Sequence, residues 1–99
     1  AYELAKTLAS HQLYSLAIEI GKDLLKKLKK LDDLYEPLEY YLALWSYDMG
    51  DFKKADYWIN KYLSKFPYGN YSDQLQALRD KVLFEVNDSN ATEQLKKID

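Results

Sequence analysis

The fold is decided by residues 42–67, which read LALWSYDMGDFKKADYWINKYLSKFP. Gly50 is expected to end one helix, because glycine readily adopts the left-handed conformation that follows a helix. Asp51 comes next and can accept hydrogen bonds from the first amide groups of a second helix, expected from Phe52 to Lys65. Pro67 cannot continue that helix because it lacks a backbone N–H. Two helices joined by a tight turn are therefore predicted.

Apolar residues recur at helical spacing on both sides of this stretch. The helix that ends at Met49 is expected to begin near Glu36, with Pro37 in its first turn, where a missing N–H costs nothing. The whole chain is predicted to form helices over residues 2–10, 14–31, 36–49, 52–65 and 71–86, then a break at Asn87 to Asn90 and a short sixth helix from Asn90 to Ile98. The short linkers imply that neighbouring helices are antiparallel.

The chain also repeats itself. A shift of 38 positions places Leu4, Ala5, Tyr14 and Ala17 on Leu42, Ala43, Phe52 and Ala55. A further shift of 34 positions places Ala43 and Leu44 on Ala77 and Leu78. A helix pair of this size cannot bury both of its faces alone, so stacked pairs would share one core. We therefore expect one domain over residues 1–99, made of three units at about 2–31, 36–67 and 71–98.

Composition supports a helical chain and argues against several functions. Three glycines and two prolines stand against seventeen leucines and thirteen lysines, and 47% of the residues are hydrophobic, too many for a disordered chain. The net charge of -2 argues against nucleic-acid binding, because such domains are usually basic. No apolar run approaches the roughly 18 residues that a membrane span needs, so no span is expected.

The middle unit resembles the tetratricopeptide repeat. The resemblance is carried by Leu42-Ala43, Gly50-Asp51-Phe52, Ala55, Ile59 and Pro67. The chain departs from the repeat at Glu39, Ser46 and Ile59, where large aromatic residues are usual. The resemblance implies an all-α fold, a right-handed alpha solenoid of about three antiparallel helix pairs, in which the first helix of each pair lines a concave groove.

A second resemblance concerns the junction at residues 62–72, which reads YLSKFPYGNYS. It is similar to the repeat junctions of bacterial cell-envelope proteins of this superfamily, such as outer-membrane assembly lipoproteins and Tol-Pal coordinators. This likeness implies a location in the bacterial cell envelope or periplasm, with the cytoplasm as the alternative.

The groove positions of the repeat, carried onto this chain, give the candidate partner-binding residues. They are Tyr2, Lys6, Ala9 and Ser10 in the first unit, Tyr40, Leu44, Tyr47 and Asp48 in the second, and Gln74, Leu78 and Lys81 in the third. Tyrosine offers contact area at little cost in rotamer entropy, and flanking charges fix the register of a bound chain. Such a groove would suit an extended or helical peptide.

Groups for bond chemistry are scarce. His11 is the only histidine and the chain has no cysteine, which excludes a histidine-based triad, a multi-histidine metal site and thiol chemistry within it. The acidic pairs lack calcium-loop spacing, and the three glycines are too isolated for a phosphate-binding loop. We therefore expect no enzymatic activity, no cofactor and no metal.

The remaining surface signal is a cluster of lysines, namely Lys22, Lys26, Lys27, Lys29 and Lys30. It could attract an acidic partner or a lipid headgroup, although a solvated helix face is the simpler explanation. The sequence as a whole predicts a non-catalytic module or scaffold that binds another protein or peptide. The alternative is a self-assembling structural domain that forms a homo-oligomer through its terminal repeat.

Overall fold

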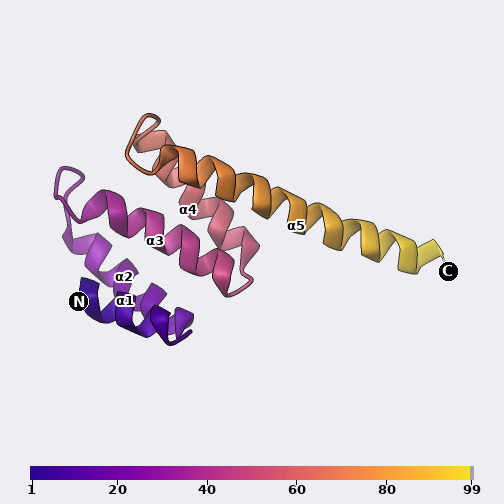
Figure 1. Cartoon of the computed structure of the whole chain (residues 1–99), viewed down its shortest axis with the longest axis horizontal. Coiled ribbons are helices and arrows are strands. Elements are labelled where there is room, and N and C mark those ends of the chain that lie inside the picture. The colour runs from indigo at the N-terminus through magenta and orange to yellow at the C-terminus, as the bar shows by residue number, and fades with distance from the viewer. Residues whose placement is uncertain (99) are drawn as a thin grey trace.

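Five α-helices follow one another along the chain, each turning back beside the one before it (Figure 1). A computed structural model describes the backbone of residues 1–98 and the side chains of residues 1–87. The helices are α1 (Tyr2–Ser10), α2 (Tyr14–Lys27), α3 (Tyr35–Asp48), α4 (Phe52–Lys65) and α5 (Ser72–Ile98). Residues 1–98 contain no strand, so the all-α class is confirmed. None of these helices combines the length and the apolar character needed to cross a membrane.

The hairpin of α3 and α4 has the turn that the sequence predicts. Pro37 lies in the first turn of α3, and Gly50 follows that helix with a φ of 85°. The side chain of Asp51 accepts a hydrogen bond of 3.2 Å from the backbone N–H of Lys54, which caps α4. Local chemistry alone therefore fixes this reversal of the chain.

Two predicted boundaries are wrong. The second helix ends at Lys27 rather than Leu31, since Leu28 is extended and the Asp32 carboxylate accepts a hydrogen bond of 2.7 Å from the Lys29 N–H. An aspartate that bonds nearby backbone in this way competes with helix continuation.

The predicted break at Asn87 to Asn90 and the separate sixth helix are also wrong, because α5 is continuous. Asparagine, aspartate and serine each cost only a few tenths of a kcal/mol in a helix, and this segment holds no glycine or proline. The third unit is thus one helix and not a pair.

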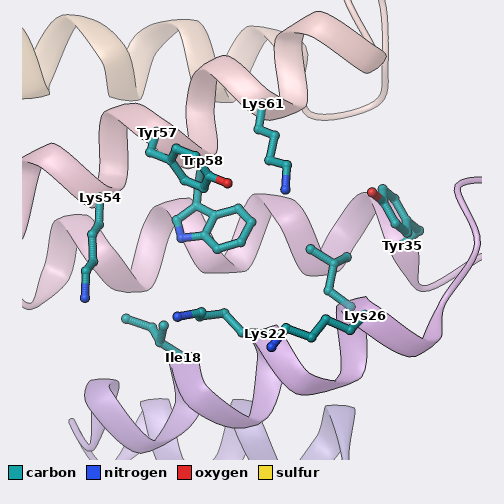
Figure 2. A pocket seen from close by; sticks show the side chains of 9 residues that line it. Ile18, Lys22, Lys26, Tyr35, Lys54, Tyr57, Trp58 and Lys61 are labelled. Atoms are coloured by element: carbon teal, nitrogen blue, oxygen red, sulfur yellow. The ribbon is translucent and has the colours of Figure 1, made fainter.

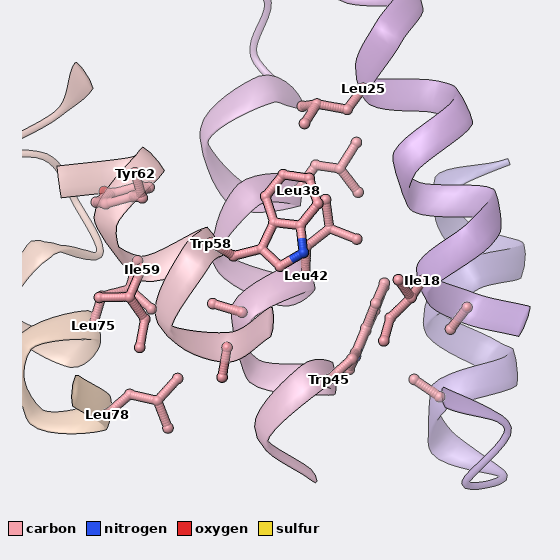
Figure 3. Close-up of a cluster of buried hydrophobic side chains, with 14 of the residues drawn as sticks. Ile18, Leu25, Leu38, Leu42, Trp45, Trp58, Ile59, Tyr62, Leu75 and Leu78 are labelled. Atoms are coloured by element: carbon pink, nitrogen blue, oxygen red, sulfur yellow. The ribbon is translucent and has the colours of Figure 1, made fainter. Parts of the chain in front are cut away.

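Four alanines bring the helices of the first two units close together. Ala5 and Ala17 in the first unit, and Ala43 and Ala55 in the second, have no exposed surface. They are the positions that the internal repeat superimposes, so the repeat marks the helix contacts. Each helix contacts the next along the chain, and α3 also contacts α5. Larger side chains from α2, α3, α4 and α5 fill the core around these contacts (Figure 3).

A hydrogen-bonded junction fastens the linker between α4 and α5 to the start of α3. Tyr62, which is fully buried, donates its hydroxyl hydrogen to Glu36 and accepts a hydrogen bond of 2.8 Å from the Tyr71 N–H. The same Glu36 oxygen accepts a second hydrogen bond, 2.7 Å long, from the Asn70 N–H. Burial and the bond to the carboxylate both raise the pKa of Tyr62, so the phenol remains the donor.

Gly69 is required at this junction because neighbouring atoms leave no room for a side chain, and not because its backbone adopts a positive φ. A Cβ atom there would lie 2.5 Å from the Tyr62 hydroxyl, 2.6 Å from Glu36 Oε2 and 2.8 Å from the Phe66 Cβ. Contacts this short cannot persist, so any side chain at this position must push the network apart.

We predict that Gly69→Ala lowers the free energy of unfolding by about 2 kcal/mol, through overpacking and loss of hydrogen bonds. Denaturant unfolding followed by circular dichroism measures this loss. Tyr68→Ala is the matched control in the same turn, because Tyr68 is 97% exposed and should change stability little. Equal stability of the two variants would show that the junction does not hold the linker.

Candidate functional site

Helix α3 presents different residues on opposite sides of its axis. Leu42 and Ser46 are buried, and Leu38 lies one turn before Leu42 in the same core. Tyr40 and Leu44 are partly exposed and project from the other side, because residues two apart on a helix point about 200° away from each other. Tyr40 and Leu44 therefore lie away from the most deeply buried side of α3.

One hollow of about 260 Å³ lies between α3 and α5. Its lining consists of Tyr40, Leu44, Gln74, Ala77, Leu78 and Lys81. Five of these six residues belong to the predicted set, and the sixth is Ala77. Here the structure brings together residues 40 and 81, which lie far apart in sequence.

A second hollow of about 210 Å³ lies between α3 and the first two helices. It is lined by Lys6, Ala9, Ser10, Tyr14, Tyr41, Trp45 and Asp48. Four of these were predicted, namely Lys6, Ala9, Ser10 and Asp48. Sequence reasoning missed Tyr14, Tyr41 and Trp45. Of these, Tyr41 and Trp45 are large aromatics on the helix expected to line the groove.

The last two predicted residues line neither hollow. The ring of Tyr2 meets Tyr41 edge-on with centroids 6.1 Å apart, and burial raises the pKa of Tyr2 to about 12. Tyr2 therefore borders the second hollow through its contact with Tyr41. Tyr47 instead packs against Phe52 with ring centroids 5.6 Å apart, which makes it part of the α3–α4 hairpin.

Aromatic rings connect the two hollows. Tyr40 stacks on Tyr71 with centroids 4.5 Å apart and planes 15° apart, and it meets Tyr41 at 5.1 Å. Burial raises the pKa of Tyr40, so its hydroxyl stays neutral and can donate a hydrogen bond. The ammonium of Lys6 lies 5.2 Å from the centre of the Tyr2 ring and 5.5 Å from that of Tyr41. The result is a continuous aromatic surface with a cation at one end.

Charges of both signs lie along this surface. Desolvation raises the pKa of the Asp48 carboxyl, and the positive charge of Lys81 acts in the opposite direction. Asp48 lines one hollow and Lys81 the other, so an anionic and a cationic side chain stand at fixed places beside the aromatic rings. Among the described residues no three histidine, cysteine or acidic side chains are grouped to hold a metal ion.

A larger hollow of about 480 Å³ lies between α2 and α4 and contains none of the predicted binding residues (Figure 2). Its α4 wall consists of Lys54, Tyr57, Trp58 and Lys61. Their spacing of i, i+3, i+4 and i+7 is the signature of one helix face, so the sequence did contain a signal for this surface. Trp58 is only 6% exposed, so most of its ring lies in the core.

The fold places the chain among all-α proteins built from consecutive antiparallel helices, as its described residues show (Figure 1). Comparisons of the chain with protein-family models, with curated proteins and with solved structures gave no match. The two hollows flanking α3 on its tyrosine-bearing side contain most of the predicted binding residues.

One ionisable pair lies inside the protein. Glu39 has no exposed surface, and its Oε1 lies 3.4 Å from the Lys65 ammonium, which also donates a hydrogen bond of 2.6 Å to the Tyr35 hydroxyl. The other carboxylate oxygen, Oε2, has no hydrogen-bond partner. Burial raises the pKa of Glu39, and the nearby Lys65 only partly opposes that rise. The charged carboxylate is therefore tolerated because of Lys65.

We predict that Lys65→Met destabilises the protein by roughly 3 kcal/mol at pH 7, because a buried carboxylate loses its ion-pair partner. The loss should shrink as the pH falls toward 4.5, the ordinary value for Glu39, since the protonated acid needs no cation. Denaturant unfolding at several pH values measures both effects. In the Glu39→Gln background the same lysine substitution should cost less, and equally at every pH, because only its contacts with Tyr35 are then lost. A loss independent of pH in the protein that retains Glu39 would contradict this account.

Proposed function

We propose that this chain is a non-catalytic protein-interaction module that binds a segment of a partner polypeptide on its α1–α3–α5 face. We define this face as the residues that line the two smaller hollows. The observation that carries the proposal is the gathering of Tyr40, Leu44, Gln74, Leu78 and Lys81 around one hollow between α3 and α5. In this proposal the helix pairs form a short solenoid of the tetratricopeptide type, and the face is its inner groove.

The size of the hollows supports a peptide as the ligand. At about 260 and 210 Å³ each is smaller than the roughly 300 to 1,000 Å³ of a typical small-molecule site. Each is of a size to receive one side chain. The hollows flank α3, whose diameter with side chains is about 10 Å, and an extended segment of about four residues spans that distance. One short stretch of partner chain can therefore occupy both.

The chemistry of the face supports the same ligand. Tyr40 and Leu44 supply apolar area for anchor side chains, and tyrosine is favoured in such surfaces for its rigidity and its polar tip. Lys81 and Asp48 can pair with a carboxylate and a backbone N–H of the ligand, which fixes its direction. The compartment we propose is the bacterial cell envelope, on the likeness of the 62–72 junction.

An exposed apolar strip on α5 favours a second candidate function, self-assembly. The strip comprises Leu83, which is 51% exposed, and Phe84, which is 69% exposed, while Val86, 39% exposed, borders Leu83 one turn further along the helix. Phe84 is left exposed because no described helix covers this part of α5. Burial of the strip against a second copy would remove large apolar side chains from water.

We predict that Tyr40→Ala and Leu44→Ser each weaken peptide binding about tenfold, because both remove an anchor contact. The ligand is the tightest binder selected from a library of displayed twelve-residue peptides, and fluorescence anisotropy gives its dissociation constant. Tyr68→Ala is the matched control, since Tyr68 lies outside both hollows and is fully exposed in the 66–71 linker. Unchanged affinity in the folded Tyr40 and Leu44 variants would refute the proposed face.

If self-assembly is the function, light scattering will show a dimer that survives dilution to about 1 µM. Phe84→Glu should then return the chain to a monomer, because a charge on the buried strip costs more than the contact gains. Tyr57→Glu provides the control, since Tyr57 is a comparably exposed aromatic on α4. A chain that stays monomeric when concentrated excludes this candidate and leaves the peptide-binding proposal standing.

A further inference from the structure

The hollow between α2 and α4, called the α2–α4 trough below, combines an apolar floor with a basic rim. It is lined by Ile18, Lys22, Leu25, Lys26, Tyr35, Lys54, Tyr57, Trp58 and Lys61. Four of these residues are lysines and none is acidic. Figure 2 shows lysines projecting from both helices that form the walls, with the Trp58 ring between them. Attraction for an anion is therefore built into both sides of the trough.

The lysines of the trough are largely free to pair with a ligand. Lys54 lies 3.8 Å from Asp51, and its side chain is 62% exposed. Within the described side chains, no carboxylate lies within ion-pair distance of Lys22, Lys26 or Lys61. Unpaired ammonium groups on two facing walls create a positive potential over the apolar floor. An anion placed there would gain contacts that the protein itself does not satisfy.

The floor of the trough can receive an apolar group. Trp58 supplies the central ring, and Ile18 of α2 faces it (Figure 2). Leu25 of α2 also lines the trough. The Lys61 ammonium lies 5.3 Å from the centre of the Trp58 ring and 5.5 Å from that of Tyr57. This cation–π arrangement holds the charge at the edge of the aromatic floor. A ligand that is both anionic and apolar matches the trough.

We propose that the α2–α4 trough binds an acidic segment of a partner protein, with one aromatic or large aliphatic side chain seated on Trp58. Carboxylates on either side of that anchor pair with the lysines of the two walls. No residue lines both the trough and the α1–α3–α5 face, so this inference stands or fails independently of the proposed function.

The spread of the lysines favours an acidic segment over a compact anion. Lys54 and Lys61 are seven residues apart on α4, which places their Cα atoms about 10 Å apart along the helix. Figure 2 shows their ammonium groups at separate places along the trough. A phosphate or a single carboxylate would meet only part of this row. About three residues of extended chain cover the same length and can present several carboxylates to it.

Two tryptophans allow a direct test by NMR. Trp58 lines the trough, whereas Trp45 lines the second hollow of the α1–α3–α5 face. We expect the peptide acetyl-Asp-Glu-Phe-Glu-Asp-amide to shift the indole N–H signal of Trp58 and to leave that of Trp45 unchanged. Phe replaced by Ala in the peptide, or its acids by the corresponding amides, should weaken binding about tenfold. Binding on the other face would move the Trp45 signal instead.

Paired lysine variants test the role of charge. Lys22→Gln with Lys54→Gln removes one lysine from each wall and should raise the dissociation constant about tenfold. Lys27→Gln with Lys53→Gln removes the same charge from the same two helices outside the trough, and should change it less than twofold, or about 0.4 kcal/mol. Tyr57→Ser, at a residue 54% exposed, removes part of the floor with little risk to folding and should also weaken binding.

Three results would overturn the proposal. The first is no movement of the Trp58 signal with the acidic peptide at about 1 mM, the concentration at which binding worth about 4 kcal/mol is half complete. The second is equal loss of affinity in the two lysine pairs, which would mean that only net charge matters. The third is equal binding of phenyl phosphate with the same dependence on the lining lysines, which would assign the trough to small anions.

Discussion

Close contact between helices at Ala5, Ala17, Ala43 and Ala55 is the constraint on which the rest of this structure depends. None of these four residues has any exposed surface, and a larger side chain at a fully covered helix contact would push the two helices apart. Once the pairs are drawn together, larger side chains such as Leu38 can only fill the spaces on either side. Small residues thus determine how closely the two helices of each pair pack.

Small residues also allow helices of neighbouring units to pack closely together. Gly21 of α2 is buried, and a Cβ atom there would lie 3.0 Å from Leu42 Cδ2 on α3. Ser46, one turn further along α3, is also buried, and its hydroxyl donates a hydrogen bond of 2.7 Å to the Leu42 carbonyl oxygen. With α2 and α4 both lying against α3, the space between them has α3 beneath it. The trough is therefore the space that α2 and α4 leave between them when both pack closely against α3.

Local chemistry in the sequence predicts the existence and order of the first four helices. It does not predict that α5 is continuous or that the larger hollow forms between α2 and α4. Gly50, Asp51 and Pro67 act through their own backbone or side chain, so their effects can be read one residue at a time. The continuity of α5 depends on weak helix preferences summed over many residues, so no single residue predicts it. Glu39 and Ser46 occupy positions at which the tetratricopeptide repeat usually carries aromatics, and both prove to be buried. Glu39 pairs with Lys65, and Ser46 donates a hydrogen bond to a backbone carbonyl.

Ala77 links the irregular third unit to the proposed function. Its counterpart Ala43 is covered completely and lies on the helix that pairs with α4, whereas Ala77 is exposed because α5 does not turn back on itself. It lies in the hollow between α3 and α5. A partner segment seated in that hollow would cover Ala77, as a second helix covers the equivalent alanine in a complete pair. Binding would then complete the packing that the third unit begins, and its free energy would come largely from apolar surface that the chain alone leaves in water.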